Sequence, residues 1–151
     1  DLAVLSRKGF GVRFIEWMPI GRPSANFTER FIPGEEIKAR IEEGLGRLAP
    51  VREEGPARVY RLEDAQGEIG FITAFSAPFC ATCNRMRLTA DGKLRPCLLS
   101  TKEIDLRGPL RARATDDELR RLFKRGIREK PFAHGIPSES PHDRTMSEIG
   151  G

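Results

Sequence analysis

Residues 80–97 read CATCNRMRLTADGKLRPC, and this stretch does most to determine what the chain can be. All three cysteines of the protein, Cys80, Cys83 and Cys97, lie within it. The first two share a single turn, and the turn-forming residues 90–92 predict a β-hairpin between the second and the third. A hairpin returns the chain toward its start, so the spacing is natural for three thiolates around one metal centre.

The number and clustering of the cysteines limit the roles that they can have. An odd number argues against a closed disulfide framework, and a tight cluster favours metal binding or redox chemistry. A zinc site needs a fourth ligand, such as His134, His142 or a carboxylate. A [4Fe–4S] cluster tolerates three cysteines if its fourth iron stays open for a substrate. The spacing alone leaves iron–sulfur, zinc and three unligated buried thiols as alternatives.

Two arginines follow the second cysteine. On a strand, Arg85 and Arg87 would project to the same face, beside the metal. Guanidinium groups bind phosphate oxygens in a bidentate manner, so the pair suits a polyphosphate. The alternative is that they pair with carboxylates such as Asp91 or Glu16.

Upstream, residues 11–18 predict a mostly buried strand that ends at Pro19. Arg13 and Glu16 interrupt this apolar run, and burying a charge is costly unless it is paired or faces a ligand. Both a structural ion pair and a ligand role remain open. A loop is expected from residue 19 to residue 34.

The other expected elements are assigned from periodicity and turn residues. The sequence predicts a helix over 34–48, a hairpin over 59–72 and a helix that opens with a capping box at 115–118. Residues 131–151 contain little apolar material and predict a frayed tail. The expected apolar face of the last helix consists of Leu119, Leu122, Phe123 and Ile127.

Composition sets the broad class. A chain of 151 residues with 38% hydrophobic and 32% charged residues is typical of one soluble domain. The sequence holds neither a membrane-spanning apolar run nor a secretory signal, so a cytoplasmic location is expected. The net charge of +4 fits an anionic small molecule, a nucleic acid or merely a solvated surface.

Four stretches give the chain a resemblance to the carboxyl-terminal half of the GTP 3′,8-cyclases, radical S-adenosylmethionine (SAM) enzymes of molybdenum cofactor biosynthesis. They are residues 13–18, 78–89, 91–98 and 149–151. The resemblance implies an α/β to α+β fold, in which the end of an incomplete (βα) TIM-like barrel is followed by antiparallel hairpins and helices that carry a second cluster. It also implies a division into a barrel part (1–33), a cluster- and GTP-binding region (34–130) and a tail (131–151).

The resemblance also implies roles for individual residues. Cys80, Cys83 and Cys97 match the ligands of the second [4Fe–4S] cluster, whose open iron is approached by the guanine of GTP. Gly150 and Gly151 match a tail that enters the active site, where glycine permits close approach to a ligand. The remaining matched residues are Arg85 and Arg87, which hold the substrate, Arg13 near the triphosphate and Met18 near SAM.

In the family, SAM and a first [4Fe–4S] cluster are held through a Cys-x3-Cys-x2-Cys motif that these 151 residues do not contain. The chain is therefore expected to be a fragment, a partly determined enzyme or one product of a split gene, inactive alone. In the complete enzyme, SAM cleavage yields a radical that removes hydrogen from C3′ of GTP, and C3′ then attacks C8. The product is (8S)-3′,8-cyclo-7,8-dihydroguanosine 5′-triphosphate.

The partners implied are GTP, SAM, the amino-terminal radical SAM half and a downstream cyclic pyranopterin monophosphate synthase. The resemblance leaves room for a homodimer and implies neither a membrane nor a nucleic-acid partner. Two competing hypotheses are a small zinc-stabilised module that binds nucleic acid and an inert remnant without a partner half.

Overall fold

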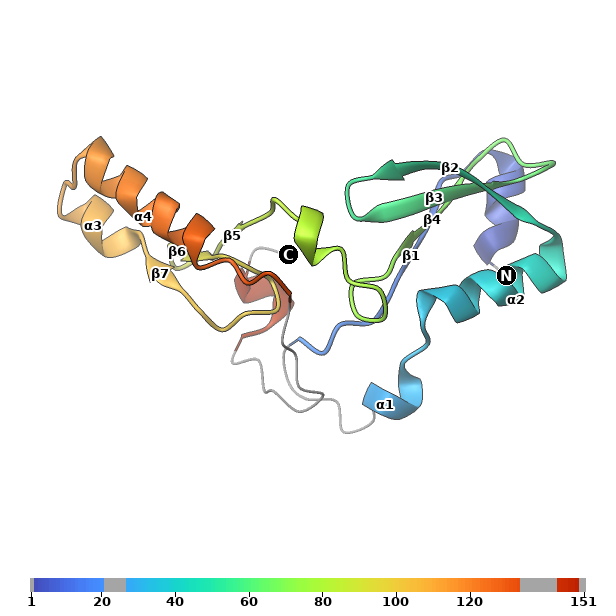
Figure 1. Cartoon of the computed structure of the whole chain (residues 1–151), viewed down its shortest axis with the longest axis horizontal. Coiled ribbons are helices and arrows are strands. Elements are labelled where there is room, and N and C mark those ends of the chain that lie inside the picture. Colours follow the sequence, from blue (N-terminus) through green and yellow to red (C-terminus); the bar gives the residue numbers. More distant parts are fainter. Residues whose placement is uncertain (1, 21–26, 134–143, 150–151) are drawn as a thin grey trace. The chain divides into compact units, whose positions relative to one another are not determined.

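The computed structural model describes residues 2–20, 27–133 and 144–149 of the chain (Figure 1). It divides into two compact units, of which unit 1 comprises Asp1–Met18 and Glu29–Phe79. Unit 2 comprises Pro19–Thr28 and Cys80–Gly151. Unit 1 contains a mixed sheet and unit 2 an antiparallel sheet, each accompanied by helices. This combination confirms the α+β class.

The sheet of unit 1 has four strands in the order β1-β4-β3-β2 (Figure 1). The parallel pair is β1 (Val12–Ile15) and β4 (Ile69–Ile72), and β3 (Ala57–Leu62) pairs antiparallel with β4 and with β2 (Leu48–Glu54). The predicted 59–72 hairpin is confirmed by β3 and β4. The strand predicted over 11–18 is shorter and alternates between half-buried and exposed residues, so the expectation of a mostly buried strand is wrong.

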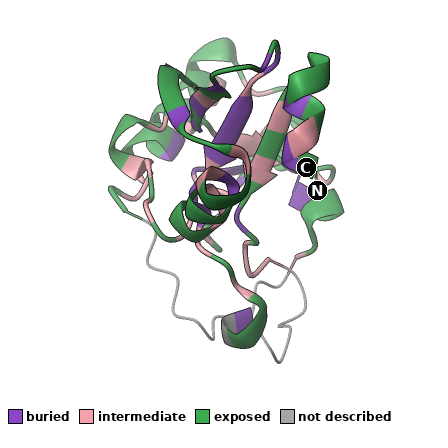
Figure 2. Cartoon of the chain, turned by 90° about the vertical axis from the view of Figure 1, so that its right-hand side faces the viewer, coloured by how far each residue is buried: buried purple, intermediate pink, exposed green. Residues whose placement is uncertain are grey.

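An apolar core supports this sheet. β4 is buried at three of its four positions (Figure 2), and the ring of Phe71 stacks on Phe14 with centroids 5.6 Å apart. A short 3-10 helix, η1 (Leu2–Lys8), contributes the fully buried Ala3. The buried members of the core are Ala3, Ile41, Leu48, Leu62, Ala65, Ile69 and Phe71.

Helix α2 (Gly34–Leu45) ends earlier than its apolar pattern predicts. Gly46 adopts a φ of +105°, a conformation that a side chain disfavours and that stops the helix. Leu48 therefore begins β2 instead of ending α2. The sequence prediction missed β2, because its proline and charged residues are poor strand signals. A second correction is a short helix, α1 (Phe27–Arg30), within the segment expected to be a loop.

Unit 2 is built on three short antiparallel strands in the order β5-β6-β7. They are β5 (Arg87–Leu88), β6 (Lys93–Arg95) and β7 (Ile104–Asp105), and the first two confirm the predicted hairpin. Gly92 turns the hairpin with a φ of +84°, and its carbonyl accepts hydrogen bonds from the amides of residues 106 and 107. The last strand, β7, was not predicted.

Two helices lie beside this sheet (Figure 1), α3 (Arg107–Arg111) and α4 (Asp116–Arg128). The capping box at Thr115 and Glu118 is confirmed in both directions. A Cβ on Gly126 would lie 2.7 Å from a methyl of Leu94, so this glycine lets α4 approach the strands. The predicted apolar face is wrong for Phe123 and Ile127, which are 44% and 60% exposed.

Two further 3-10 turns complete unit 2, η2 (Cys80–Thr82) and η3 (Met146–Ile149). Ile149 is fully buried, so the frayed tail expected from composition is wrong for residues 144–149. None of the helices within the described parts of the chain has the length and apolar character needed to cross a membrane.

Candidate metal and nucleotide site

The three cysteines lie at the two ends of the hairpin of unit 2. Cys80 begins η2, and the amide of Cys83 donates to the carbonyl of Cys80 at 3.2 Å, so one turn holds both residues. Cys97 lies two residues beyond β6. All three are free thiols and half-buried.

The strand register relates the third cysteine to the first two. Arg87 pairs with Arg95 in antiparallel strands, so the segments that carry Cys83 and Cys97 leave the two strands at the same end of the hairpin. The ammonium group of Lys130 donates to the carbonyl of Arg85 at 2.6 Å and to that of Pro96 at 3.0 Å. One lysine therefore ties the segment after Cys83 to the segment before Cys97.

The hairpin brings the backbone segments together without gathering the thiols themselves. Across residues 2–20, 27–133 and 144–149, no three His, Cys, Asp or Glu side chains converge closely enough to hold a metal ion. His134 and His142, considered as zinc ligands, lie outside the described residues, as do Gly150 and Gly151.

The electrostatic surroundings of Cys83 suit a thiolate ligand. Burial opposes ionisation, but hydrogen bonds from the backbone and side chain of Arg85, and the nearby charge of Lys130, outweigh it. The pKa of the Cys83 thiol is therefore lowered from its ordinary value of 9.0. Metals and iron–sulfur clusters bind the thiolate form, so Cys83 is suited to ligate such a group.

The two arginines occupy different local structures. Arg87 lies in β5 and is half-buried, whereas Arg85 is exposed and precedes the strand. Strand alternation therefore does not extend to Arg85, which contacts Cys83 instead. The carboxylates considered as alternative partners are engaged elsewhere. Asp91 accepts from Thr89 and Arg144, and Glu16 accepts from backbone amides of unit 1.

Arg13 and Met18 belong to unit 1. Arg13 extends across Gly70, where a Cβ would lie 2.6 Å from its Cδ, and its guanidinium is 3.3 Å from a carboxylate oxygen of Glu54. Met18 is half-buried and lies three residues beyond β1. Thus the described contacts join Arg85 to Cys83, while Arg13 has a structural ion pair within its own unit.

Glu16 has a structural role that neither sequence alternative described. Its carboxylate is 3% exposed and accepts hydrogen bonds from the amides of Gly34, Phe75 and Ser76 at 2.8–2.9 Å, and from the Ser76 hydroxyl. Burial raises its pKa, but the four hydrogen bonds prevail and lower it from 4.5. Among the described residues, amides and a hydroxyl therefore take the place of the ion pair that was one of the two open alternatives, and no side-chain pattern reveals such partners.

Sequence reasoning also missed an ionic cluster in unit 2. Arg144 lies 2.8 Å from Asp91 and 2.6 Å from Glu103, and Glu103 lies near Lys93 and Arg95. Hydrogen bonds from Arg144 and Thr89 hold the pKa of Asp91 well below its usual range. These residues are dispersed in the sequence, so no local spacing could have found them.

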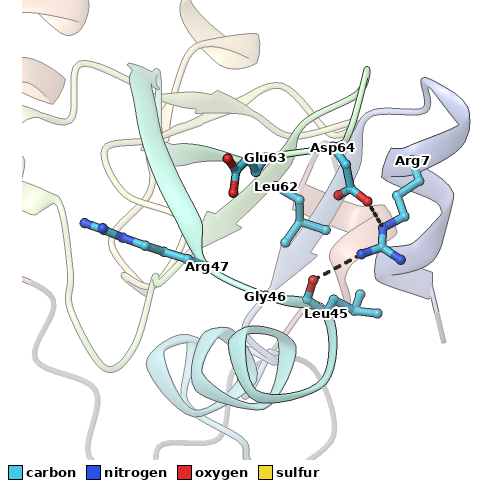
Figure 3. Close-up of a pocket in the computed structure, with 7 residues that line it drawn as sticks. All are labelled: Arg7, Leu45, Gly46, Arg47, Leu62, Glu63 and Asp64. Carbon is cyan, nitrogen blue, oxygen red and sulfur yellow. Dashed lines mark hydrogen bonds and ion pairs between the residues drawn. The ribbon is translucent and has the colours of Figure 1, made fainter.

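A surface pocket in unit 1 lies where α2 ends (Figure 3). Arg7 points into it, donates to the carbonyl of Leu45 at 3.1 Å and pairs with Asp64 at 3.3 Å. Arg7 therefore satisfies a carbonyl at the carboxyl end of a helix, where a cation is favoured. The lining residues of this pocket, Arg7, Leu45, Gly46, Arg47, Leu62, Glu63 and Asp64, include none of the predicted site residues.

Comparisons with known proteins identify a family and relatives to which this chain is similar. Residues 10–136 match the family model described as Molybdenum Cofactor Synthesis C. A GTP 3′,8-cyclase of Heliobacterium modesticaldum is 50% identical over 145 residues, which cover 93% of this chain and 44% of that protein. A GTP 3′,8-cyclase of Moorella thermoacetica is 47% identical over 154 residues, covering 100% of this chain and 47% of that protein. The chain thus spans about half the length of these relatives.

Proposed function

The chain belongs to the Molybdenum Cofactor Synthesis C family, and from that premise we propose that it is the cluster- and GTP-binding part of a GTP 3′,8-cyclase. The complete enzyme would convert GTP to 3′,8-cyclo-7,8-dihydroguanosine triphosphate in molybdenum cofactor biosynthesis. The observation that carries the proposal is the closed hairpin of unit 2. There Lys130 donates to the carbonyls of Arg85 and of Pro96, the residue before Cys97, and Arg85 contacts Cys83.

In this proposal Cys80, Cys83 and Cys97 hold a [4Fe–4S] cluster. The cluster would supply one iron without a protein ligand, a position at which the guanine base can bind. Arg85 is exposed and its side chain contacts Cys83, so its guanidinium would lie beside the cluster. Arg85 and Lys130 also favour the thiolate form of Cys83.

The arginines would hold the triphosphate. Arg85 and Arg87 carry planar donor groups that match phosphate oxygens, and fixing both ends of GTP orients C3′ toward C8. We assign Arg13 to the triphosphate and Met18 to the neighbourhood of SAM. Gly150 and Gly151 would enter the active site, and they are the only residues here assigned to the catalytic step.

The other half of the enzyme would supply the radical chemistry. We propose that an amino-terminal part holds SAM and the first [4Fe–4S] cluster, and that residues 1–33, which include β1, are the end of its partial barrel. Four further points stay predictions. They are the domain divisions at residues 33 and 130, the cytoplasmic location, the formation of a homodimer, and the delivery of product to a cyclic pyranopterin monophosphate synthase.

The nucleotide role is tested by titrating GTP into the anaerobically reconstituted protein. Arg85→Ala is expected to weaken GTP binding by about 1–3 kcal/mol, because a charge-assisted contact to phosphate is lost. Iron content should not change. The matched control is Arg120→Ala, which removes an exposed ion pair with Asp117 on α4. Equal GTP affinity in the Arg85 variant and the control would refute the assignment.

A further inference from the structure

A fully buried guanidinium lies next to the third cysteine. Arg95 is 0% exposed and precedes Cys97 by two residues. Its Nη2 donates to the carbonyl of Ser100, and its Nε lies 3.7 Å from Oε1 of Glu103. Among the described residues, its Nε and Nη1 have no hydrogen-bond acceptor. A buried cation is costly without compensation, so the carboxylate of Glu103 is essential to Arg95.

The segment that Arg95 contacts is the Cys97 loop, residues 96–100. Within it, the amide of Ser100 donates to the carbonyl of Cys97 at 3.2 Å, which closes a tight turn. Lys130 binds the carbonyl of Pro96 at the start of the loop, and Arg95 binds that of Ser100 at its end. Two cationic side chains therefore fix both ends of the turn that carries Cys97.

Glu103 is shared between Arg95 and a residue near the carboxyl end of the chain. Arg144 faces both carboxylate oxygens of Glu103: its Nη2 donates to Oε2 at 3.0 Å, and its Nε lies 2.6 Å from Oε1 as an ion pair without a hydrogen bond. The Arg144 and Glu103 side chains are only 16% and 14% exposed, so solvent screens this pair weakly. Arg144 also binds Asp91 in the hairpin turn, at 2.8 Å.

We propose that Arg144, Glu103 and Arg95 form an ionic brace that positions Cys97 for cluster binding. Arg144 holds Glu103, Glu103 balances the charge of Arg95, and Arg95 holds the Cys97 loop. Arg144 is thus a positioning residue for the third thiolate, although it lies 47 positions after Cys97 in the sequence. This inference rests on the proposed function, because it takes Cys97 as a ligand of the cluster.

The first test needs no metal. In a full chain carrying Cys80→Ser and Cys83→Ser, the rate at which a maleimide modifies Cys97 reports how often the loop opens. Arg144→Ala is expected to raise this rate about tenfold, since a lost charge-assisted hydrogen bond is commonly worth a factor of that order. Arg144→Lys keeps the positive charge but loses the planar guanidinium that faces both carboxylate oxygens, so it should raise the rate by a smaller factor.

The control is Arg120→Ala, which removes an exposed arginine of the same unit and should leave the rate unchanged. Circular dichroism verifies that each variant is folded. If Arg144→Ala does not fold, the Cys97 reactivity of Arg144→Lys decides whether the brace exists. Equal Cys97 reactivity in the folded Arg144 variant and in the Arg120 control would overturn the brace.

The second test measures iron loss to a chelator from the reconstituted protein with its three cysteines intact. Arg144→Ala should release iron about tenfold faster than the parent and the Arg120 control, for the same reason. If the parent takes up no iron, the proposed function fails while the maleimide rates still decide the brace. If the parent holds iron and Arg144→Ala releases it at the parental rate, the inference alone is wrong.

Discussion

The two units differ in what holds them together. Unit 1 has strands of four to seven residues, an apolar core centred on Ile69 and Phe71, and one buried carboxylate satisfied by amides. Unit 2 has strands of two or three residues, and the buried members of its core cluster, among the residues that the structure describes, are Leu94, Ile104 and Leu106. The same unit contains ion pairs among the buried Arg95 and the half-buried Glu103 and Arg144.

The cysteine-bearing unit therefore depends less on apolar burial and more on charge pairs. A small core rarely supplies enough stability alone, and a bound metal or charge network commonly compensates. Unit 1 should therefore respond most to changes in packing, and unit 2 to changes in charge and metal. The following predictions test this contrast.

The largest effect is expected in the core of unit 1. Phe71 is 4% exposed and contacts the rings of Phe14 and Tyr60. Phe71→Ala should lower the free energy of unfolding by about 3–5 kcal/mol, because it removes buried surface and leaves a cavity. Trp17, the single tryptophan, lies in unit 1 and reports this loss by fluorescence during urea unfolding. An equal loss of amide protection in unit 2 would show that the units unfold together and end the contrast.

The next effect concerns the buried carboxylate of unit 1. Glu16→Gln should lower the free energy of unfolding by about 2–3 kcal/mol at pH 7, because an amide NH2 cannot accept the hydrogen bonds that the carboxylate accepts. The folded pKa of Glu16 lies below 4.5, so its contribution is present above that pH and is lost as the pH falls through the folded pKa.

Urea unfolding at several pH values measures both effects. The acid-dependent fall in stability should be smaller in Glu16→Gln than in the parent. Glu43→Gln changes an exposed carboxylate of α2 and serves as the control. An unchanged acid profile in the Glu16 variant would contradict this account of the buried carboxylate.

A smaller effect is expected in the ionic cluster of unit 2. Glu103→Gln should lower stability by about 1–3 kcal/mol, because it leaves Arg95 buried without its counter-charge. Hydrogen exchange of the amides of β6 measures the loss, which should be absent from β4 of unit 1. Loss of protection in β4 but not in β6 would reverse the contrast between the units.

The smallest effect is expected at the start of α4. Thr115→Ala removes the hydroxyl that accepts a hydrogen bond from the amide of Glu118. It should lower the free energy of unfolding by about 1 kcal/mol. Thermal unfolding detects this change against Thr101→Ala, an exposed threonine in the same unit. Equal melting temperatures for the two variants would show that this cap does not limit the stability of α4.

Local patterns predicted much of the fold. Both hairpins and the capping box follow from turn residues and side-chain spacing that lie within a few residues of each other. The end of α2 and the strand β2 were missed, since the conformation of Gly46 and the sheet edge override weak propensities. For the site, the cysteine hairpin was foreseen, whereas Lys130, Arg95 and Arg144 act through contacts between distant segments.

The central claim is that three cysteines of unit 2 hold an iron–sulfur cluster. The direct measurement is the iron, sulfide and zinc content of the full chain after anaerobic reconstitution, beside Cys97→Ser. The account predicts about four irons per chain and absorption near 400 nm for the parent, and markedly less of both for the variant. One tightly held zinc without iron, or equal iron in the parent and in Cys97→Ser, would contradict it.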